Sequence, residues 1–233
     1  MKAVQEARKL LQERAVVPLE GRHLVLDGLN WGLKPVYLFL SREDPEVIKR
    51  AENIGIKPVL ISEKNMARLS SLKTPPGEIL LVEPPLWKEE DFKRVVVLEG
   101  VQDPTNVGSI IRTAYCLGYD AVFTDETSAH PFSPKTVRAS AGYSLRMPTF
   151  RRNLLETLKS WKGNRKILGT FPSGGDSPAS PEGGFAVVFG NESRGIGKET
   201  ENLLDQRISI SMERGESLGV ASAAAIILYL LKG

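Results

Sequence analysis

Cysteine and histidine are almost absent from the sequence. Its 233 residues include one cysteine, Cys116, and two histidines, His23 and His130. A single cysteine cannot form an internal disulfide, and two distant histidines do not make a cluster of nitrogen and sulfur ligands. The sequence therefore predicts no internal disulfide and no structural zinc or other metal site.

Long apolar runs and a secretory signal are also missing. No apolar run approaches the roughly 20 residues that cross a bilayer. Residues 1–17, MKAVQEARKLLQERAVV, alternate charged and apolar residues at helical spacing and lack the apolar core and small-residue cleavage site of a signal peptide. With 25% charged and 41% hydrophobic residues, the chain has the composition of an ordinary soluble protein. We expect it in the cytoplasm, with no membrane partner.

Acidic residues are missing from one window of the sequence. The net charge of +3 is too small to indicate a nucleic-acid partner by itself. Between Glu126 and Glu156 there is no aspartate or glutamate, but basic residues are frequent: Lys135, Arg138, Arg146, Arg151 and Arg152. This window predicts either a surface that follows phosphates or a solvated basic face, and charge alone does not separate the two.

Short apolar segments alternate with helical patterns along the chain. In the first part they are HLVLDGL, PVYLFL, KPVLISE and EILLVEP, with helical patterns such as DPEVIKRAENIG between them. EPPLWKEEDFKR then predicts an extended connector, because two adjacent prolines precede a charge run. Beyond it come the β-type runs RVVVLEG, DAVFTD, RKILGTF, FAVVFGN and QRISISM. We therefore expect an α/β fold with a small unit over residues 1–82, a linker over residues 83–93, and a domain with a mainly parallel sheet over residues 94–233.

Two common nucleotide-binding motifs are absent from the second domain. GNESRGIGKET imitates a P-loop poorly, because Glu192 lies five residues before Gly197 and a glutamate follows Lys198. No G-x-G-x-x-G opens a helix after the first strand, which disfavours a dinucleotide fold of the usual sort. The stretch PSGGDSPASPEGG predicts a mobile loop with no packing of its own. The parallel strands must therefore bind another kind of ligand.

The stretch VVVLEGVQDPTNVGSIIRTAYCLGYDAVF predicts a strand, a tight polar turn, a helix from about Asn106 to Leu117, and a second strand. Asp103 and Asn106 suit turn and helix-cap positions. Arg112 stands among residues that we expect to be buried, and it can point back toward the carboxyl edge of the sheet. An arginine that snorkels from a packed helix explains the same pattern.

Two further stretches make a snorkelling arginine a less favoured interpretation of Arg112. They are VVFGNESRGIG, residues 187–197, and RISISMERGESLGVASAAAIILYLL, residues 207–231. Together with Asn106 and Arg112 they resemble the three motifs of the SpoU, or TrmH-like, RNA ribose methyltransferases. PFSPKTVRASAGYSLRMP is also similar to that family, and the region from EGRHLVLDGL to SEKNMARLSSLKTPPGEILLV resembles the small substrate-binding domain of many ribosomal-RNA members.

The resemblance implies a fold and a cofactor. It implies an N-terminal RNA-binding domain and a catalytic domain whose C-terminal segment forms a trefoil knot, an exception to the rule that chains avoid knots. It also implies S-adenosylmethionine, held in the knot mostly by backbone groups at positions that match Leu168, Gly169, Thr170, Gly190, Ile210 and Leu218. Glycine at position 190 leaves room for a ligand against the chain, and Ile210 and Leu218 offer apolar surface to adenine, although plain packing or a turn explains each.

The resemblance further implies catalytic roles and partners. The motif-one arginine of the family, here Arg112, is proposed to promote loss of the ribose 2′-hydroxyl proton. Because arginine stays protonated in proteins, we expect it to stabilise the developing alkoxide or a substrate phosphate. Asn106 and Glu192 are expected to orient this arginine and the nucleic acid, and Ser217 to form a hydrogen bond nearby. RNA is expected to contact four basic residues, Arg22, Lys135, Arg138 and Arg146.

The resemblance also implies that two copies pair through the catalytic domain. The helix VASAAAIILYLL contains small residues that permit close helix approach. Packing of this helix on its own sheet accounts for the same pattern.

Two positions depart from the family pattern. Gly219 stands where the family has the asparagine of SLN, and Ser211 replaces the usual proline after the isoleucine. Loss of the amide lowers the rate, shifts substrate choice, or is offset by a neighbour such as Ser222. The resemblance as a whole implies an S-adenosylmethionine-dependent 2′-O-methyltransferase of ribosomal RNA. The alternatives are a transfer-RNA methyltransferase, a non-catalytic RNA-binding relative, and a small-molecule enzyme of an unrelated α/β type.

Overall fold

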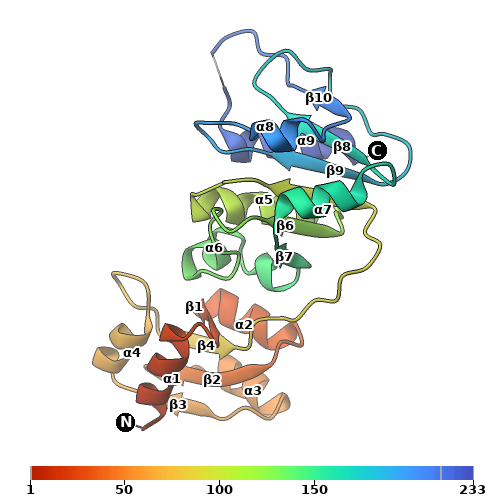
Figure 1. Cartoon of the computed structure of the whole chain (residues 1–233). Helices are drawn as coiled ribbons and strands as arrows, with labels where there is room; N and C mark the ends of the chain where they lie inside the picture. Colours follow the sequence, from red (N-terminus) through yellow and green to blue (C-terminus); the bar gives the residue numbers. More distant parts are fainter. Residues whose placement is uncertain (1, 216, 233) are drawn as a thin grey trace. The chain divides into compact units, whose positions relative to one another are not determined.

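The chain folds into two compact units. The computed structural model describes residues 2–215 and 217–232 (Figure 1). The first unit comprises Met1–Leu86 and Phe132–Arg146, and the second comprises Trp87–Pro131 and Met147–Gly233. Residues 83–93 contain no helix or strand. The segment 132–146, which the sequence analysis includes in residues 94–233, packs with the first unit.

The first unit contains a four-stranded sheet in the order β1-β4-β2-β3. Its strands are β1 (Val17–Glu20), β2 (Pro35–Leu40), β3 (Pro58–Leu60) and β4 (Glu78–Val82). β4 runs antiparallel to β1 and β2, whereas β2 and β3 are parallel. Three of the predicted apolar segments contain strands, but HLVLDGL lies in a helix, α2 (Arg22–Asn30). The apolar spacing explains this difference, because Val25, Leu26 and Leu29 are buried on one side of that helix.

Helices cover both faces of this sheet. α2, α3 (Pro45–Asn53) and α6 (Pro134–Ala139), with the 3₁₀ turn η1 (Tyr143–Leu145), share one core with Leu38 and Leu40 of β2. α1 (Lys2–Gln12) and α4 (Glu63–Leu69) share the other core with Phe39. Successive residues of β2 therefore point to opposite cores, as the pleat of a strand requires.

The second unit is built on a six-stranded sheet in the order β10-β8-β9-β5-β6-β7, and every pair of neighbours is parallel. The strands are β5 (Arg94–Leu98), β6 (Ala121–Thr124), β7 (Thr149–Arg151), β8 (Lys166–Thr170), β9 (Phe185–Phe189) and β10 (Gln206–Ile208). All five predicted β-type runs contain strands, and β7 was not predicted because it has three residues with no apolar run. The α/β class with a mainly parallel sheet is confirmed.

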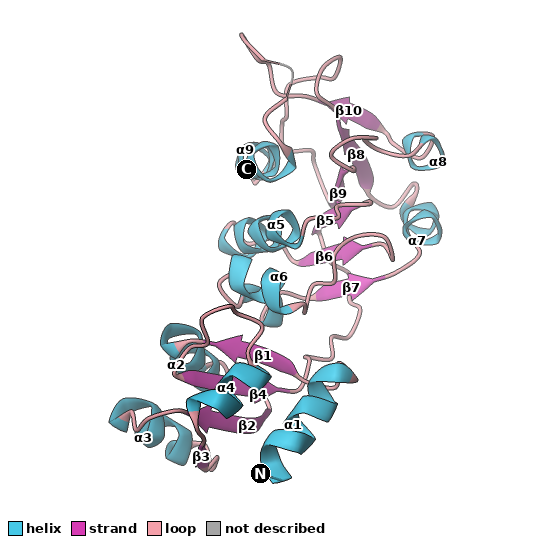
Figure 2. Ribbon diagram, turned by 90° about the vertical axis from the view of Figure 1, so that its left-hand side faces the viewer, coloured by secondary structure: helices cyan, strands magenta, loops and turns pink. Residues whose placement is uncertain are grey.

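Helices lie on both faces of this sheet too (Figure 2). α5 (Pro104–Cys116) and α9 (Val220–Leu231) cover one face and pack on Val96, Leu98 and Val187. α7 (Leu154–Trp161) and α8 (Lys198–Glu201) lie on the other side, where α7 packs on Val95 and Val97. No described helix is long and apolar enough to cross a membrane.

The glycine- and serine-rich loop is attached to the sheet at its beginning, so the prediction that it has no packing of its own is wrong. The Asp176 N–H donates to the Arg207 carbonyl at 2.9 Å, and the Ser209 N–H donates to the Asp176 carbonyl at 2.9 Å. Glycine is required next to this contact, because a Cβ on Gly175 would lie 2.6 Å from the carbonyl carbon of Ile208. The loop therefore runs beside β10.

The trefoil knot implied by the resemblance stays a prediction.

Candidate active site

A cavity of about 450 Å³ opens at the carboxyl ends of β8 and β9. Its walls come from the segments that follow these strands and β10, from α9 and the residues before it, and from one residue of α8. The lining residues are Thr170–Pro172, Phe189–Ile196, Glu201, Ile210 and Met212, and Ser217–Val220 with Ala223 and Ile227. In open sheets with parallel strands, ligands bind outside the carboxyl ends of the strands. This cavity is therefore the candidate site of the second unit.

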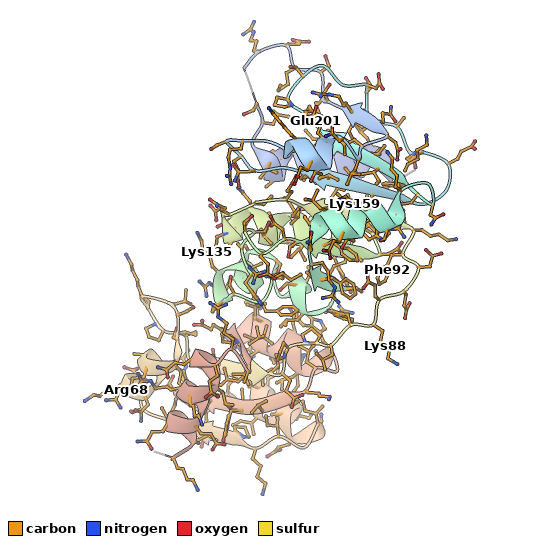
Figure 3. All side chains as sticks on the ribbon, viewed as in Figure 1. Arg68, Lys88, Phe92, Lys135, Lys159 and Glu201 are labelled. Carbon is orange, nitrogen blue, oxygen red and sulfur yellow. The ribbon has the colours of Figure 1, made fainter. Side chains whose placement is uncertain are left out.

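One part of the cavity wall is aromatic and is held by contacts with neighbouring side chains. Phe171 lines the cavity, and the guanidinium of Arg207 lies 3.6 Å from the centroid of its ring. Arg207 also forms an ion pair with Glu201 of α8, another lining residue, whose position Figure 3 shows. Thr170, at the end of β8, donates its hydroxyl to the Val188 carbonyl at 3.0 Å. These contacts hold the wall in place without a ligand.

A tight hairpin loop after β9 forms another part of the cavity wall. The N–H groups of Asn191 and Gly195 donate to each other's carbonyls at 3.0 and 2.9 Å. A Cβ on Gly190 would overlap the backbone carbonyl of Gly195 and the nitrogen of Ile196. The interpretation that glycine at position 190 leaves room for a ligand is therefore wrong. The missing side chain of Gly190 leaves room for the backbone of the hairpin itself.

Asn191 fixes both the shape and the position of this hairpin. Its side-chain oxygen accepts from the N–H groups of Ser193 and Arg194, both at 3.0 Å. Its side-chain nitrogen donates to the carbonyl of Gly100 at 2.7 Å, in the turn between β5 and α5. The two motif-bearing loops are thereby joined through one side chain.

A second amide contact joins the same two loops at the cavity. The side-chain nitrogen of Asn106, in the first turns of α5, donates to Oε1 of Glu192 at 2.9 Å. Glu192 lines the cavity. α5 begins where predicted to within two residues, and Asp103 caps it by accepting from the Thr105 N–H at 2.7 Å. The structure therefore brings together Asn106 and Glu192, which lie 86 residues apart in the sequence.

Asp125 holds the β5–α5 turn from the neighbouring strand. Its carboxylate accepts from the N–H groups of Gly100 and Ser128 at 3.1 and 2.8 Å, and from the hydroxyl of Thr127 at 2.6 Å. Burial pushes the pKa of Asp125 upward, but these hydrogen bonds outweigh it and hold the pKa below its usual value. The carboxylate therefore stays ionised at neutral pH.

Arg112 lies elsewhere. It is exposed on α5 and lines an open groove with Cys116 of the same helix and Ile226, Tyr229 and Leu230 of α9. The cavity contacts another side of α9, through Val220, Ala223 and Ile227. Arg112 forms no hydrogen bond or ion pair within residues 2–215 and 217–232. The structure does not bring Arg112 to the cavity within one chain, contrary to the expectation that it points to the carboxyl edge of the sheet.

The candidate cofactor residues divide into two groups. Thr170, Gly190, Ile210 and Leu218 line the cavity, as does Ser217. Leu168 and Gly169 do not: Leu168 is buried in the core beneath α5 and α9, and a Cβ on Gly169 would overlap Leu204. Further lining residues that were not predicted are direct or near neighbours of motif residues: Phe171, Ile196, Met212 and Ala223.

The two departures from the family pattern have distinct surroundings. Gly219 lines the cavity and directly precedes α9. Its φ of 73° and ψ of 146° form a backbone conformation that residues other than glycine rarely adopt. Ser222 is exposed and is not among the described lining residues, so the structure does not place its hydroxyl at the cavity in place of the amide. Ser211 lines a neighbouring polar pocket with Ser173 and Ser177.

All four candidate RNA-binding residues belong to the first unit. Arg22 pairs with Asp44 at 2.7 Å and with Glu46, which offsets its charge. The hydrogen bond from Arg22 is the main cause that holds the pKa of each of these carboxyls below its usual value. Arg146 lies 5.4 Å from the centroid of the Trp31 ring, and Lys135 is exposed on α6 (Figure 3).

Among the described residues, no group of three or more His, Cys, Asp or Glu is placed to hold a metal ion.

Arg138 joins α6 to the rest of its unit. Its guanidinium contacts Glu20 at 3.5 Å and the Ser71 hydroxyl at 2.7 Å. The Glu20 side chain is 1% exposed and accepts hydroxyl hydrogen bonds from Ser70 and Ser71, both at 2.5 Å. Removing the cation from a buried carboxylate is costly, because the charge loses its partner while it stays out of water.

We therefore expect Arg138→Ala to lower the free energy of unfolding by about 1–3 kcal/mol, because the serine hydroxyls still satisfy part of Glu20. Urea denaturation of the full chain measures this change. The matched control, Lys49→Ala on the exposed side of α3, is expected to change stability by less than about 0.5 kcal/mol. Equal stability of the two variants would show that the Glu20 contact is not structural.

Comparison with known proteins decides the family. The sequence profile of the SpoU rRNA Methylase family matches residues 93–229. The chain belongs to this family. It is therefore an RNA methyltransferase of the SpoU type, and the resemblance drawn from its motifs is confirmed.

Individual relatives extend the match to both units of this SpoU methyltransferase. The 23S rRNA (guanosine(2553)-2′-O)-methyltransferase RlmP of Bacillus subtilis is 32% identical over 92% of this chain and 88% of its own length. A putative RNA methyltransferase of the TrmH family from Porphyromonas gingivalis is 28% identical, with a TM-score of 0.79 over 99% of this chain and 95% of that chain. The SpoU methyltransferase AviRb from Streptomyces viridochromogenes, solved with AdoMet, shares the fold with a TM-score of 0.84 at 21% identity, over 99% of this chain and 96% of that chain.

Proposed function

We propose that this protein transfers a methyl group from S-adenosylmethionine to a ribose 2′-hydroxyl of ribosomal RNA. The observation that carries the proposal is the cavity at the strand ends, with the Glu192 carboxylate fixed at its wall by Asn106. The Bacillus relative is a 23S rRNA 2′-O-methyltransferase by name, and it supports the choice of acceptor because its similarity extends over both units.

The residues that line the cavity fit S-adenosylmethionine. A volume of about 450 Å³ is within the range of small-molecule sites. Ile196, Ile210 and Leu218 offer apolar surface for adenine, and the Glu192 carboxylate offers negative charge to a cationic ligand. When bound, S-adenosylmethionine supplies a methyl group on a sulfonium, which is already a good leaving group.

The roles of the side chains follow from their contacts. Asn106 occupies one oxygen of Glu192 and fixes its rotamer, which leaves the other oxygen to accept from a substrate hydroxyl. Ser217 lines the cavity and offers a further hydroxyl. Arg112 keeps its own proton and stabilises negative charge on the acceptor oxygen or its phosphate, and the hydroxyl proton leaves through the free oxygen of Glu192 to water.

This role of Arg112 requires a second copy of the chain. In one chain the arginine lies in the groove between α5 and α9 and not at the cavity. The groove carries large apolar side chains that are 40–59% exposed: Ile226, Tyr229 and Leu230. We propose that two copies pair through this groove, which buries these side chains and lets each chain offer Arg112 to the site of its partner.

Tyr229→Glu is expected to shift the protein from dimer to monomer at micromolar concentration, because it places a charge within the apolar contact. Sedimentation or light scattering measures the shift. Leu86→Glu is the matched control, since Leu86 is 93% exposed and lies outside the groove. A monomeric wild-type protein, or a Tyr229→Glu variant that stays dimeric, would contradict pairing through α5 and α9.

Methyl transfer to purified RNA classes tests the substrate. Labelled S-adenosylmethionine is incubated with the protein and either ribosomal or transfer RNA transcripts that carry no modification. We expect label in large-subunit ribosomal RNA and none in transfer RNA. Label in transfer RNA alone would establish the alternative substrate, and binding of RNA without any label would establish a non-catalytic relative.

A further inference from the structure

Arg194 is the unpaired cation of the cavity. Three described lining residues carry a full charge: Glu192, Arg194 and Glu201. Glu201 is neutralised by Arg207, and Glu192 is held by the neutral amide of Asn106. Arg194 is exposed, and its side chain forms no hydrogen bond or ion pair with the rest of the described chain.

The position of Arg194 is fixed although its side chain is free. It lies in the hairpin closed by the reciprocal contacts of Asn191 and Gly195. The Arg194 N–H is bound by the Asn191 side-chain oxygen at 3.0 Å, as is the N–H of Ser193. The N–H groups of Ser193, Arg194 and Gly195 are therefore used inside the hairpin, and the guanidinium is the charged donor that the hairpin offers to an anion.

We propose that Arg194 binds the RNA phosphodiester next to the ribose that enters the cavity, a role that rests on the proposed function. In RNA the carbon that carries the 2′-hydroxyl is bonded to the carbon that carries the 3′-phosphate. A ribose placed beside Glu192 therefore brings a phosphate close to the same hairpin. The carboxylate repels this phosphate, and the guanidinium two residues later offsets the repulsion with paired donors.

The exposure of Arg194 favours RNA over the cofactor as its ligand. S-adenosylmethionine also carries an anion, its carboxylate. A small ligand in a pocket is 70–90% buried or more, so the groups that hold it are expected in the walls. Arg194 is exposed at the hairpin tip, where a large ligand arrives from solvent.

Arg194→Ala in the full-length protein tests the proposal. With unmodified 23S ribosomal RNA transcript, we expect KM for RNA to rise about tenfold and kcat to stay within about threefold. A plot of the logarithm of RNA affinity against the logarithm of salt concentration is expected to become less steep by about one unit, because one phosphate contact is lost. Affinity for S-adenosylmethionine in calorimetry is expected to stay unchanged. Arg194→Lys is expected to restore most of the salt dependence and part of KM. Lys198→Ala is the matched control, because Lys198 is exposed four residues away and does not line the cavity.

Two results would overturn the role of Arg194. One is weaker S-adenosylmethionine binding with unchanged RNA affinity, which would assign the arginine to the cofactor carboxylate. The other is an RNA affinity and salt dependence equal to those of Lys198→Ala. If the wild-type protein binds RNA but transfers no methyl group, the proposed function fails, and the salt dependence of binding still decides the role of Arg194.

Discussion

Replacing Arg112 with alanine is expected to lower the rate of methyl transfer by about a hundredfold or more and to leave S-adenosylmethionine affinity nearly unchanged. Arg112 lies outside the cavity of its own chain, so its loss does not alter the walls that we assign to the cofactor. Its charge acts on the acceptor oxygen as negative charge develops there. Single-turnover methyl transfer and calorimetry measure the two effects separately.

Arg112→Lys is expected to fail almost as badly, because a point charge on a flexible stem does not reproduce a planar fork. Lys159→Ala, an exposed cation on α7 (Figure 3), is expected to leave the rate unchanged. Light scattering must show that the Arg112 variants remain dimeric, since the side chain lies in the groove. A dimeric Arg112→Ala enzyme with normal turnover would remove the arginine from the mechanism.

The second large effect is expected from Gly190→Val. A Cβ at this position overlaps the backbone of Gly195 and Ile196, so the hairpin must move and the cavity wall moves with it. Overpacking of this kind costs about 1–3 kcal/mol. We expect S-adenosylmethionine affinity to fall by roughly 10- to 100-fold while circular dichroism shows a folded protein.

Gly184→Ala is the matched control in the same unit. A Cβ there would lie 3.4 Å from its nearest neighbour, the Lys93 carbonyl oxygen, and Gly184 does not line the cavity. We expect its cofactor affinity to match that of the wild type. Unchanged affinity in Gly190→Val would mean that the cofactor binds elsewhere.

Much of the second unit was predictable from local patterns. Buried parallel strands give continuous β-branched runs such as RVVVL and FAVVF, which form β5 and β9. The turn residues before α5 predicted its start, since capping depends on neighbours in sequence. The resemblance to the SpoU family implied that Asn106 and Glu192 share one site, and their hydrogen bond shows that they are adjacent.

Features that depend on tertiary contacts were not predictable. The attachment of the 172–177 segment to β10 depends on a close backbone approach at Gly175, which leaves no pattern in the sequence. The packing of residues 132–146 on the first unit depends on distant partners: Val137 and Leu145 enter its core, and Arg138 contacts a carboxylate 118 residues away. The direction of the Arg112 side chain depends on how α5 packs through Ile110 and Ile111, and the apolar neighbours alone did not determine whether the arginine points to the carboxyl edge of the sheet.

The most direct test of the central claim is the position of the transferred methyl group. The protein is incubated with labelled S-adenosylmethionine and unmodified 23S ribosomal RNA, the labelled nucleotide is mapped, and the RNA is digested to nucleosides for mass spectrometry. The account predicts label in a 2′-O-methylated nucleoside, and no transfer to an RNA that carries a 2′-deoxy sugar at the mapped position. A methyl group on a base, or methylation of the deoxy RNA, would contradict it.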